Sequence, residues 1–314
     1  RNAPMVKCQM MPESIGQNDS MPAAHRAMFW YFNTVMTPWD GPAAIAATDG
    51  RWVVASMDRN GLRPMRYTVT ADGLLIVGSE TGMVRVPDEV ALEKGRDGPG
   101  QMIAVDLAEG RFYHDREIKD MLASKQPFTE WVKRITQIDD LIKTDTAAAP
   151  ELSPEELRRR QLVYGLSMED MELILQPMVE DGKEAVGSMG DDTPLAVLSS
   201  NYRGLHHFFR QNFSQVTNPP IDSLRETRVM SLKTRLGNLG NILAEEESQC
   251  NLLQLDSPVL SNTEFDAMRD YMGDTAHEID VTFNPDGGPN ALRTAITRIQ
   301  REAEDAVRGG CVHI

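Results

Sequence analysis

The first half of the chain is a succession of short apolar runs separated by turn residues. Four of these runs are divided by Asp-Gly or Asn-Gly pairs and lie at residues 44–48, 52–57, 65–70 and 74–78. Such pairs supply the positive φ angles that tight hairpin turns require. Residues 101–107 and 111–113 flank Glu109-Gly110 in the same manner. The pattern predicts an antiparallel meander without strand–helix–strand units.

Helical spacing marks the segments on both sides of these strands. Residues 22–35 place apolar side chains three and four positions apart, with Ser20 available as the N-terminal cap. Residues 115–124 and 127–142 have the same spacing. We expect three helices that pack on the strands, the last two closing the first domain.

A small and polar stretch, KTDTAAAPEL, follows at residues 143–152. Such composition is typical of a linker. We therefore place the domain boundary near Pro150, which divides the chain into residues 1–150 and 151–314.

The second half opens with helix signals. Ser153 can cap a helix that has Pro154 at its first position, where proline is tolerated. Residues 168–181 carry apolar residues at helical spacing. Pro177 should kink or shorten this helix, and Gly182 should end it.

Strand and helix signals alternate toward the C-terminus. Residues 252–255 and 279–283 have the composition of strands, and Ser261 begins a capping box between them. A long helix is predicted over residues 290–308, and residues 311–314 resemble a strand that has just begun. The order predicts an incomplete α/β second domain. Since the chain also does not begin with methionine, we expect an internal piece of a longer polypeptide.

Composition narrows the possible partners. The chain has 314 residues, 41% of them hydrophobic, and a formal net charge of −15. This charge argues against nucleic acid and against anionic membrane surfaces. The sequence contains no apolar run near the roughly 20 residues of a membrane helix and no signal-peptide core. We expect a globular protein of the cytoplasm or the plastid stroma.

The cysteines and histidines do not predict a metal site. Cys8, Cys250 and Cys311 are far apart in the sequence and form no C-x-x-C pair. The adjacent His206 and His207 would point about 100° apart on a helix. We assign no metal-binding and no cofactor-binding residue in this chain.

Two motifs in the second half are more specific than the hydrophobic periodicity and turn signals found elsewhere in the chain. They are GSMGDDTPLAVLS at residues 187–199 and QVTNPPID at residues 215–222. A glycine-rich loop or a Pro-Pro turn alone is common at turns and loops of many proteins. Together and in this order, they resemble the opening of the central domain of the glutamate synthase family.

A third motif lies among the predicted strands. MDRNGLRPMRY at residues 57–67, followed by VGSETG, resembles the C-terminal half of a class II glutamine amidotransferase domain. The matching positions are Asp58, Asn60, Gly61, Arg63, Pro64, Ser79 and Glu80. The resemblance implies an N-terminal-nucleophile sandwich of two antiparallel sheets between helices. The alternative is a simple turn at Asn60-Gly61 with Arg63 paired to Glu80 across the sheet.

The catalytic chemistry of that superfamily is not found in this chain. Its nucleophile is an N-terminal cysteine whose own α-amino group acts as the base. Residue one here is Arg1, and Cys8 has seven residues ahead of it. The family's His-Asn-Gly oxyanion segment has no counterpart either. We therefore assign no catalytic residue.

The order of the two resemblances, amidotransferase and then central domain, is that of glutamate synthase. The resemblance implies glutamine hydrolysis, passage of ammonia through a tunnel, and reductive amination of 2-oxoglutarate at a flavin. It further implies FMN and a 3Fe-4S cluster in the full-length enzyme, with neither in this piece. The implied partners are the rest of the same polypeptide and a small electron-donating subunit or ferredoxin.

A role for this piece follows from the need to protect ammonia. Ammonium is charged and would cross an apolar passage only at high cost. The resemblance implies that the central domain helps to wall the tunnel. Glycine and X-Pro positions hold backbone groups in fixed geometries, and the candidates for the tunnel wall are Ser188, Met189, Gly190, Asp191, Thr217 and Asn218.

Two alternatives belong to other classes of function. One is a non-catalytic binding or assembly module. The other is a different class II amidotransferase, such as the phosphoribosyl enzyme. That enzyme would need a phosphate-binding loop and an acidic pair, but GSMGDD at residues 187–192 lacks the preceding apolar strand.

Overall fold

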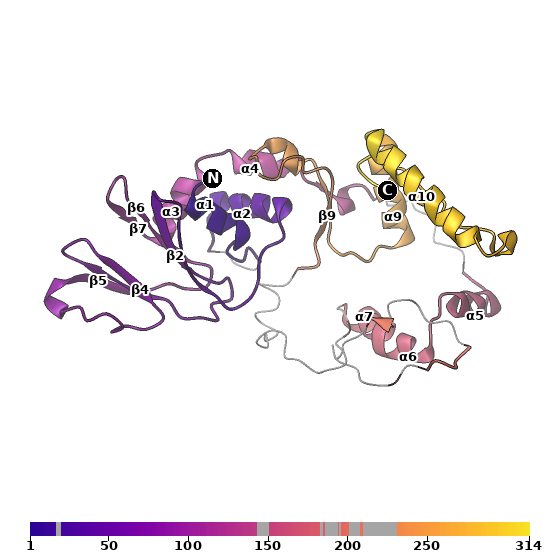
Figure 1. The fold of residues 1–314 in the computed structure, drawn as a ribbon, viewed down its shortest axis with the longest axis horizontal. Helices are drawn as coiled ribbons and strands as arrows, with labels where there is room; N and C mark the ends of the chain where they lie inside the picture. Colours follow the sequence, from indigo (N-terminus) through magenta and orange to yellow (C-terminus); the bar gives the residue numbers. More distant parts are fainter. Residues whose placement is uncertain are drawn as a thin grey trace. The chain divides into compact units, whose positions relative to one another are not determined.

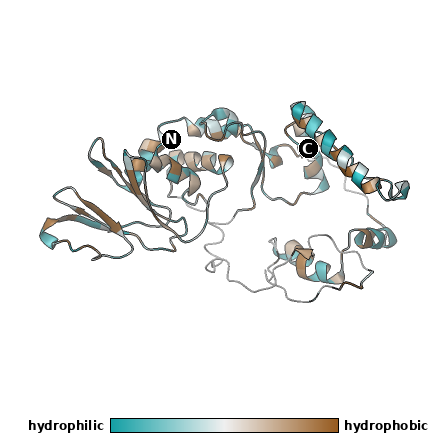
Figure 2. Ribbon diagram, in the orientation of Figure 1, coloured by the Kyte–Doolittle hydropathy of each residue, from teal (hydrophilic) through white to brown (hydrophobic). Residues whose placement is uncertain are grey.

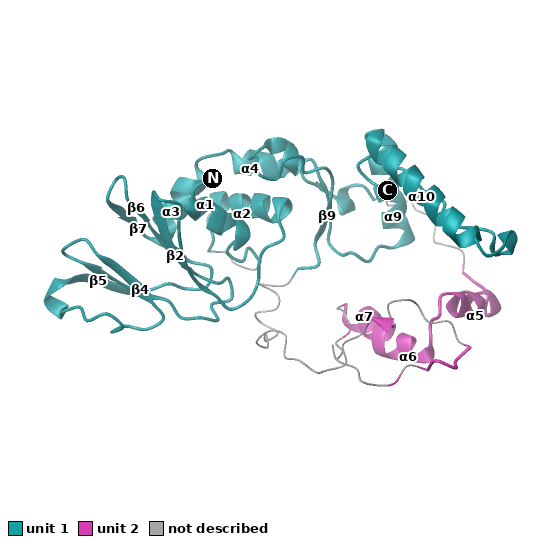
Figure 3. Ribbon diagram, viewed as in Figure 1, with its two compact units in different colours: residues 1–144, 221–314 teal, residues 145–220 magenta. Residues whose placement is uncertain are grey.

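The computed structural model describes residues 1–16, 20–142, 151–182, 185, 194, 196–200, 208–209 and 231–314. The chain divides into two compact units (Figure 3). The larger unit joins residues 1–144 to residues 221–314, and the smaller comprises residues 145–220. Of the linker predicted over residues 143–152, residues 143–150 lie outside the described residues, so the division near Pro150 stays a prediction.

The first sheet has the order β1-β2-β6-β7, and its neighbouring strands are antiparallel. The strands are β1 Ala44–Thr48, β2 Trp52–Met57, β6 Met102–Asp106 and β7 Arg111–Tyr113. Gly50 and Gly110 adopt positive φ in the two connecting turns. Both hairpins were predicted from the Asp-Gly and Glu-Gly positions, and both are confirmed.

The second sheet has the order β4-β3-β5 and is also antiparallel. It consists of β3 Arg66–Thr70, β4 Leu75–Gly78 and β5 Ala91–Arg96. The β3–β4 hairpin is confirmed. Strand β5, ALEKGR, was not predicted, because its charges and glycine are poor strand signals.

The antiparallel meander predicted over residues 44–78 is wrong as one continuous sheet. Strand β2 pairs with β1 and β6, whereas β3 pairs with β4 and β5. Asn60-Gly61 therefore lies in a loop that carries the chain from one sheet to the other. The dipeptide signal predicted the turn correctly but not which strands pair.

Three helices pack on one face of the first sheet (Figure 1). They are α1 Ala3–Met10, α2 Ala23–Val35 and α3 Asp115–Ala123. The predicted helices over residues 22–35 and 115–124 are confirmed. Ser20 is not the cap of α2, since the N-cap is Pro22 and no side chain caps that end.

The opposite face of the first sheet packs on the second sheet. Ala55, Met65 and Ile103 are buried there. The rings of Tyr67 and Phe112, from the two sheets, lie 5.9 Å apart. The first sheet thus has helices on one face and another sheet on the other.

The long helix predicted over residues 127–142 is wrong. The chain instead forms one helical turn, α4 Phe128–Trp131, and later a short strand, β8 Thr136–Gln137. Ile135 belongs to the core beneath α2, whereas Ile138 belongs to a separate cluster with Leu253. An extended segment reaches both clusters, while a helix would present both isoleucines to one side.

The third sheet contains strands from both sequence segments of the larger unit, residues 1–144 and 221–314. Strand β10 Leu253–Leu255 pairs parallel with β8 and antiparallel with β9 Thr234–Leu236. The predicted strand over residues 252–255 is confirmed. Its partner β8 lies more than a hundred residues earlier in the chain.

Two helices end the chain. In α9 Asn262–Met272, Ser261 forms the predicted capping box with Glu264. The other helix, α10 Ala291–Arg308, matches the predicted long helix. Figure 2 shows both hydrophilic and hydrophobic residues along α10, as its three- and four-residue apolar spacing predicts.

The strand predicted over residues 279–283 is not formed. The side chain of Asp280 accepts hydrogen bonds from the backbone and the hydroxyl of Thr282. Such local bonds compete with strand pairing. The predicted strand over residues 311–314 is reduced to a single parallel bridge between Ala276 and His313.

The regular structure described in the smaller unit is helical. Helix α5 Pro154–Val163 is capped by Ser153, as predicted. Helices α6 Met168–Asp170 and α7 Gln176–Asp181 are joined by the π-helical turn Met171–Leu175. This turn ends two residues before Pro177, whose ring and missing N–H disrupt regular helix. Gly182 ends α7 with a positive φ, as predicted.

Candidate functional site

Asp58 is the centre of the loop that follows β2. Its side chain is 1% exposed. The carboxylate accepts hydrogen bonds from the backbone N–H groups of Ala43 at 3.2 Å, Asn60 at 3.0 Å, Leu62 at 3.1 Å and Arg63 at 3.3 Å. Hydrogen bonds to a charged acceptor are stronger than neutral ones. This one side chain therefore fixes both the entry and the turn of the loop.

The backbone of Asp58 joins the loop to the segment between β5 and β6. Its carbonyl oxygen accepts N–H bonds from Gly61 at 3.1 Å and from Gly100 at 2.9 Å. Gly61 has a φ of +68°, and a Cβ there would lie 2.6 Å from Cγ of Pro99. The loop therefore requires glycine at residue 61 on both conformational and steric grounds.

Asn60 is held by a side-chain contact as well as by the turn. Its Nδ2 donates to Asp40 at 2.7 Å, and its side chain is buried. Its Oδ1 atom is buried without a hydrogen-bond partner among the described residues. Among the described residues, no ion pair joins Arg63 to Glu80, so the alternative of a cross-sheet pair between them is not realised.

A cluster of buried charges lies behind this loop. Lys7 is 6% exposed, and its Nζ donates to the carbonyl oxygen of Gly100 at 2.7 Å. Lys119 is 1% exposed, and its Nζ lies 2.7 Å from a carboxylate oxygen of Glu13 and 2.7 Å from one of Asp115. Lys7 thus ties α1 to the segment that supports the Asp58 loop, and Lys119 ties α3 to Glu13, which follows α1 in the chain.

Burial and neighbouring charges shift the pKa values in this cluster. Burial lowers the pKa of Lys7 to about 8. Burial alone would also lower the pKa of Lys119, but Asp115 and Glu13 outweigh it and raise that pKa. Asp97 is 5% exposed, and burial, together with the nearby Asp115, raises its pKa to about 6. Its Oδ2 atom has no partner among the described residues.

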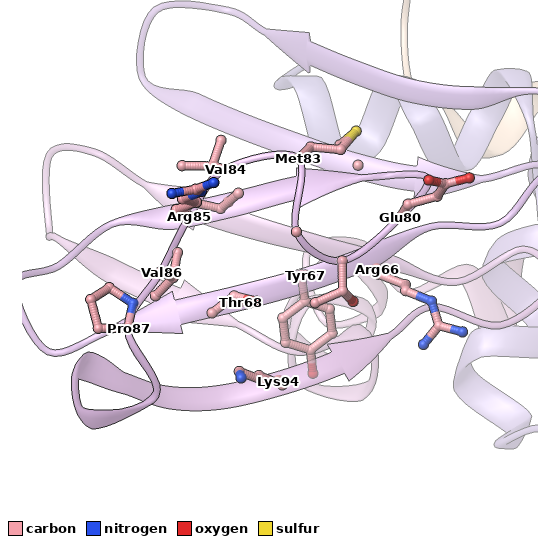
Figure 4. Close-up of a pocket in the computed structure, with 14 residues that line it drawn as sticks. Arg66, Tyr67, Thr68, Glu80, Met83, Val84, Arg85, Val86, Pro87 and Lys94 are labelled. Atoms are coloured by element: carbon pink, nitrogen blue, oxygen red, sulfur yellow. The ribbon is translucent and has the colours of Figure 1, made fainter.

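Ser79 and Glu80 lie apart from the Asp58 loop, after β4. The segment from Glu80 to Pro87 folds back over the outward face of the second sheet and leaves a groove of about 520 Å³ (Figure 4). Arg66, Lys94 and Arg85 contribute positive charge to its lining. The groove is a mixed apolar and cationic recess.

The structure therefore brings together four of the predicted motif residues, Asp58, Asn60, Gly61 and Arg63, in one loop. It places Ser79 and Glu80 in another. The predicted tunnel residues lie outside the described residues: Ser188, Met189, Gly190, Asp191, Thr217 and Asn218. Sequence reasoning missed Lys7, Asp97 and Lys119. Only Lys7 is a charge within an otherwise apolar segment, whereas Asp97 and Lys119 have charged neighbours in the sequence and give no such signal.

The described residues contain no group of three or more histidines, cysteines or acids placed to hold a metal ion. Cys8 and Cys250 are fully buried in one apolar core. Burial raises the pKa of each thiol to about 11, which favours the protonated form that packs rather than the thiolate that binds metal. Among the described residues, no helix is long and apolar enough to cross a membrane.

Two protein families account for almost all of the chain. Residues 1–131 match the class-II glutamine amidotransferases, and residues 159–314 match the glutamate synthase central domain. The chain thus combines an amidotransferase region with a central-domain region. It belongs to the glutamate synthase family.

Curated relatives agree with this assignment. The chain is 66% identical, over its whole length, to 21% of the glutamate synthase [NADPH] large chain of Azospirillum brasilense. It is 39% identical, over 96% of its length, to 19% of the corresponding large chain of Bacillus subtilis. It is 42% identical, over 89% of its length, to 18% of ferredoxin-dependent glutamate synthase 2 of Synechocystis. The chain spans about a fifth of the length of these relatives.

Proposed function

We propose that this chain is part of a glutamate synthase that makes L-glutamate from L-glutamine and 2-oxoglutarate. The reaction would proceed by glutamine hydrolysis, ammonia transfer and reductive amination. The observation that carries this proposal is the 66% identity over the full chain to a glutamate synthase large chain. The same order of amidotransferase and central regions supports it.

The proposed architecture is an N-terminal-nucleophile sandwich over residues 1–150 and an incomplete α/β central domain over residues 151–314. Packing of the first sheet between helices and a second sheet supports the sandwich. Pairing of β10 with β8 supports close association of the two regions.

The role proposed for this piece is that of a scaffold and a wall of the ammonia tunnel, without catalytic residues of its own. Ammonia must be kept from protonation and from water on its way between active sites. The backbone from Ser188 to Asp191 and at Thr217 and Asn218 is proposed to form part of that wall. The supporting argument is the fixed geometry of glycine and X-Pro positions.

Replacement of Asn218 by alanine in the full-length protein tests the tunnel. We expect the formation of glutamate from 2-oxoglutarate to fall several-fold with glutamine as the nitrogen donor and to be retained with ammonia, because only the former uses the tunnel. Both rates are measured with saturating 2-oxoglutarate and reductant. Equal loss of the two rates would contradict a role in the tunnel.

The cofactors and partners follow from the same proposal. FMN and a 3Fe-4S cluster would be held by other parts of the polypeptide. Electrons would come from a small subunit or from ferredoxin, since relatives carry NADPH, NADH and ferredoxin in their names. The compartment would be the cytoplasm or the plastid stroma.

The proposal as a whole is tested by the intact mass and the absorption spectrum of the natural polypeptide that contains this sequence. We expect a mass several times 35.0 kDa and a flavin spectrum. A colourless chain of about this size would favour a binding or assembly module instead.

A further inference from the structure

A segment from the central-domain region is built into the amidotransferase region. We call residues 233–255 the strap. It runs through β9 to β10 and packs on the last turns of α2 and on α4 (Figure 1). The strap lies within the match to the glutamate synthase central domain, whereas α2 and α4 lie within the match to the amidotransferases.

Gln249 makes the most specific contact of the strap. Its side chain is 1% exposed. Its Oε1 accepts hydrogen bonds from the hydroxyl of Tyr31 and from the N–H of Glu246 at 3.3 Å. Its Nε2 donates to the carbonyl oxygens of Leu239 at 3.1 Å and Asn241 at 3.0 Å. Every polar position of this amide is used, so the contact fixes the strap against Tyr31 in one register.

Tyr31, which bonds to Gln249, packs in the core of the amidotransferase region. Its ring is fully buried, and its centroid lies 5.1 Å from that of Phe128 and 5.3 Å from that of Trp131. Cys250, the neighbour of Gln249, is buried in the same core. The strap is therefore part of this core and not a covering over it.

A second polar chain runs parallel to the first. Trp30 Nε1 donates to Gln254 Oε1 at 3.3 Å, and Gln254 Nε2 donates to Gln137 Oε1 at 2.8 Å. Gln254 is 1% exposed. Two buried glutamines of the strap thus bond to consecutive residues of α2, Trp30 and Tyr31.

The contact at the end of α2 is less complete. Arg235 Nη1 donates to the carbonyl oxygen of Asn33 at 3.1 Å. The Nε of Arg235 and the Oδ1 of Asn33 are both buried without partners among the described residues. Unsatisfied buried groups weaken a contact, so the strap is held tightly at Gln249 and less tightly at Arg235.

We infer that the strap couples the central domain to the amidotransferase domain and that Gln249 is the positioning residue of this coupling. The inference rests on the proposed function. A displacement of the central domain would pull directly on α2 through the buried amide, and α2 packs on α1 and α3 beneath the first sheet. The polar contact sets the register, which apolar packing at Cys250 alone does not specify.

The test is Gln249→Leu in the full-length protein, together with Tyr31→Phe and the double variant. Three rates are compared: glutamine hydrolysis without 2-oxoglutarate, ammonia-dependent glutamate formation and glutamine-dependent glutamate formation. In the presence of 2-oxoglutarate, we expect the ratio of glutamate made from 2-oxoglutarate to glutamine hydrolysed to fall about threefold or more, with ammonia-dependent formation unchanged. The two single effects should be non-additive, because both remove the same contact.

Gln176→Leu is the matched control, since it makes the same change at an exposed helix position in the smaller unit. Unchanged coupling in Gln249→Leu, or an equal fall of all three rates, would overturn the inference. If the unmodified protein makes no glutamate from 2-oxoglutarate with glutamine as the nitrogen donor, the proposed function itself fails, which is a separate outcome. Where Gln249→Leu does not fold, Tyr31→Phe provides the same comparison, because it removes only the hydroxyl.

Discussion

At Asp58, four backbone amides converge on one buried carboxylate. The motif around Asp58 could be predicted from the sequence because its residue types are distinctive. The more distant partners could not, since Ala43, which donates to the carboxylate, and Gly100, which donates to the backbone carbonyl oxygen, come from other segments and contribute only backbone groups. Backbone partners leave no residue-type signal in a sequence.

Asp97 shows the opposite situation, a buried carboxyl with an unsatisfied oxygen. The charged groups that influence it are Asp115, Lys7, Lys119 and His114. Its pKa rises from 3.8 to about 6 on folding. The folded state therefore binds more protons between these values, and the stabilisation present below pH 3.8 is lost as the pH rises through 6.

Asp97→Asn should accordingly stabilise the region above pH 6 and have little effect near pH 4. Asparagine resembles the protonated acid, so the variant avoids the cost of the buried charge, on the order of 1–3 kcal/mol. Amide hydrogen exchange of β6, compared between variant and wild type at each pH, measures this. We expect exchange about tenfold slower at pH 8. Faster exchange at pH 8 would show that the charge of Asp97 stabilises the fold.

At the scale of elements, sequence patterns predicted correctly those helices and strands whose apolar side chains pack into a single hydrophobic core. Helix α2 and the two hairpins of the first sheet match their predicted positions because their patterns face a single interior. The helix predicted over residues 127–142 was wrong because the side chains of this segment pack into two separate apolar clusters. Strand β5 was missed because Gly95 and its charged neighbours are favourable there only through tertiary contacts.

Gly95 is needed in β5 by its cross-strand neighbour. It pairs with Tyr67, whose ring covers it and whose hydroxyl donates to Glu93 at 2.6 Å. A Cβ at Gly95 would overlap this ring. Gly95→Ala should therefore destabilise the second sheet by about 1–3 kcal/mol, as overpacking does.

Exchange of the β3 amides reports this change locally. We expect it to accelerate about tenfold or more in Gly95→Ala. Gly309→Ala is the control, because Gly309 has a φ of −71°, which alanine adopts readily. Equal exchange in Gly95→Ala and wild type would mean that the ring of Tyr67 moves aside without cost.

At the scale of the whole molecule, order in sequence and order in space diverge. Residues 231–314 share a compact unit with residues 1–142, although the smaller unit lies between them in the chain. The sequence pattern predicted β10 as a strand but placed the residues of β8 in a helix. Their parallel pairing across more than a hundred residues depends on the strap, which no local pattern specifies.

This arrangement predicts that the larger unit survives a break in the chain. A protease site can be inserted after Gly182, which is exposed at the end of α7. Cleavage at this site breaks the chain between β8 and β10. After cleavage of the full-length protein we expect the two pieces to elute together and to separate only in denaturant. The amides of Leu253–Leu255 should remain as protected as before, because buried residues such as Cys250 and Leu252 still hold the strap in place. Loss of that protection on cleavage would show that chain connectivity, and not packing against α2, keeps β10 beside β8.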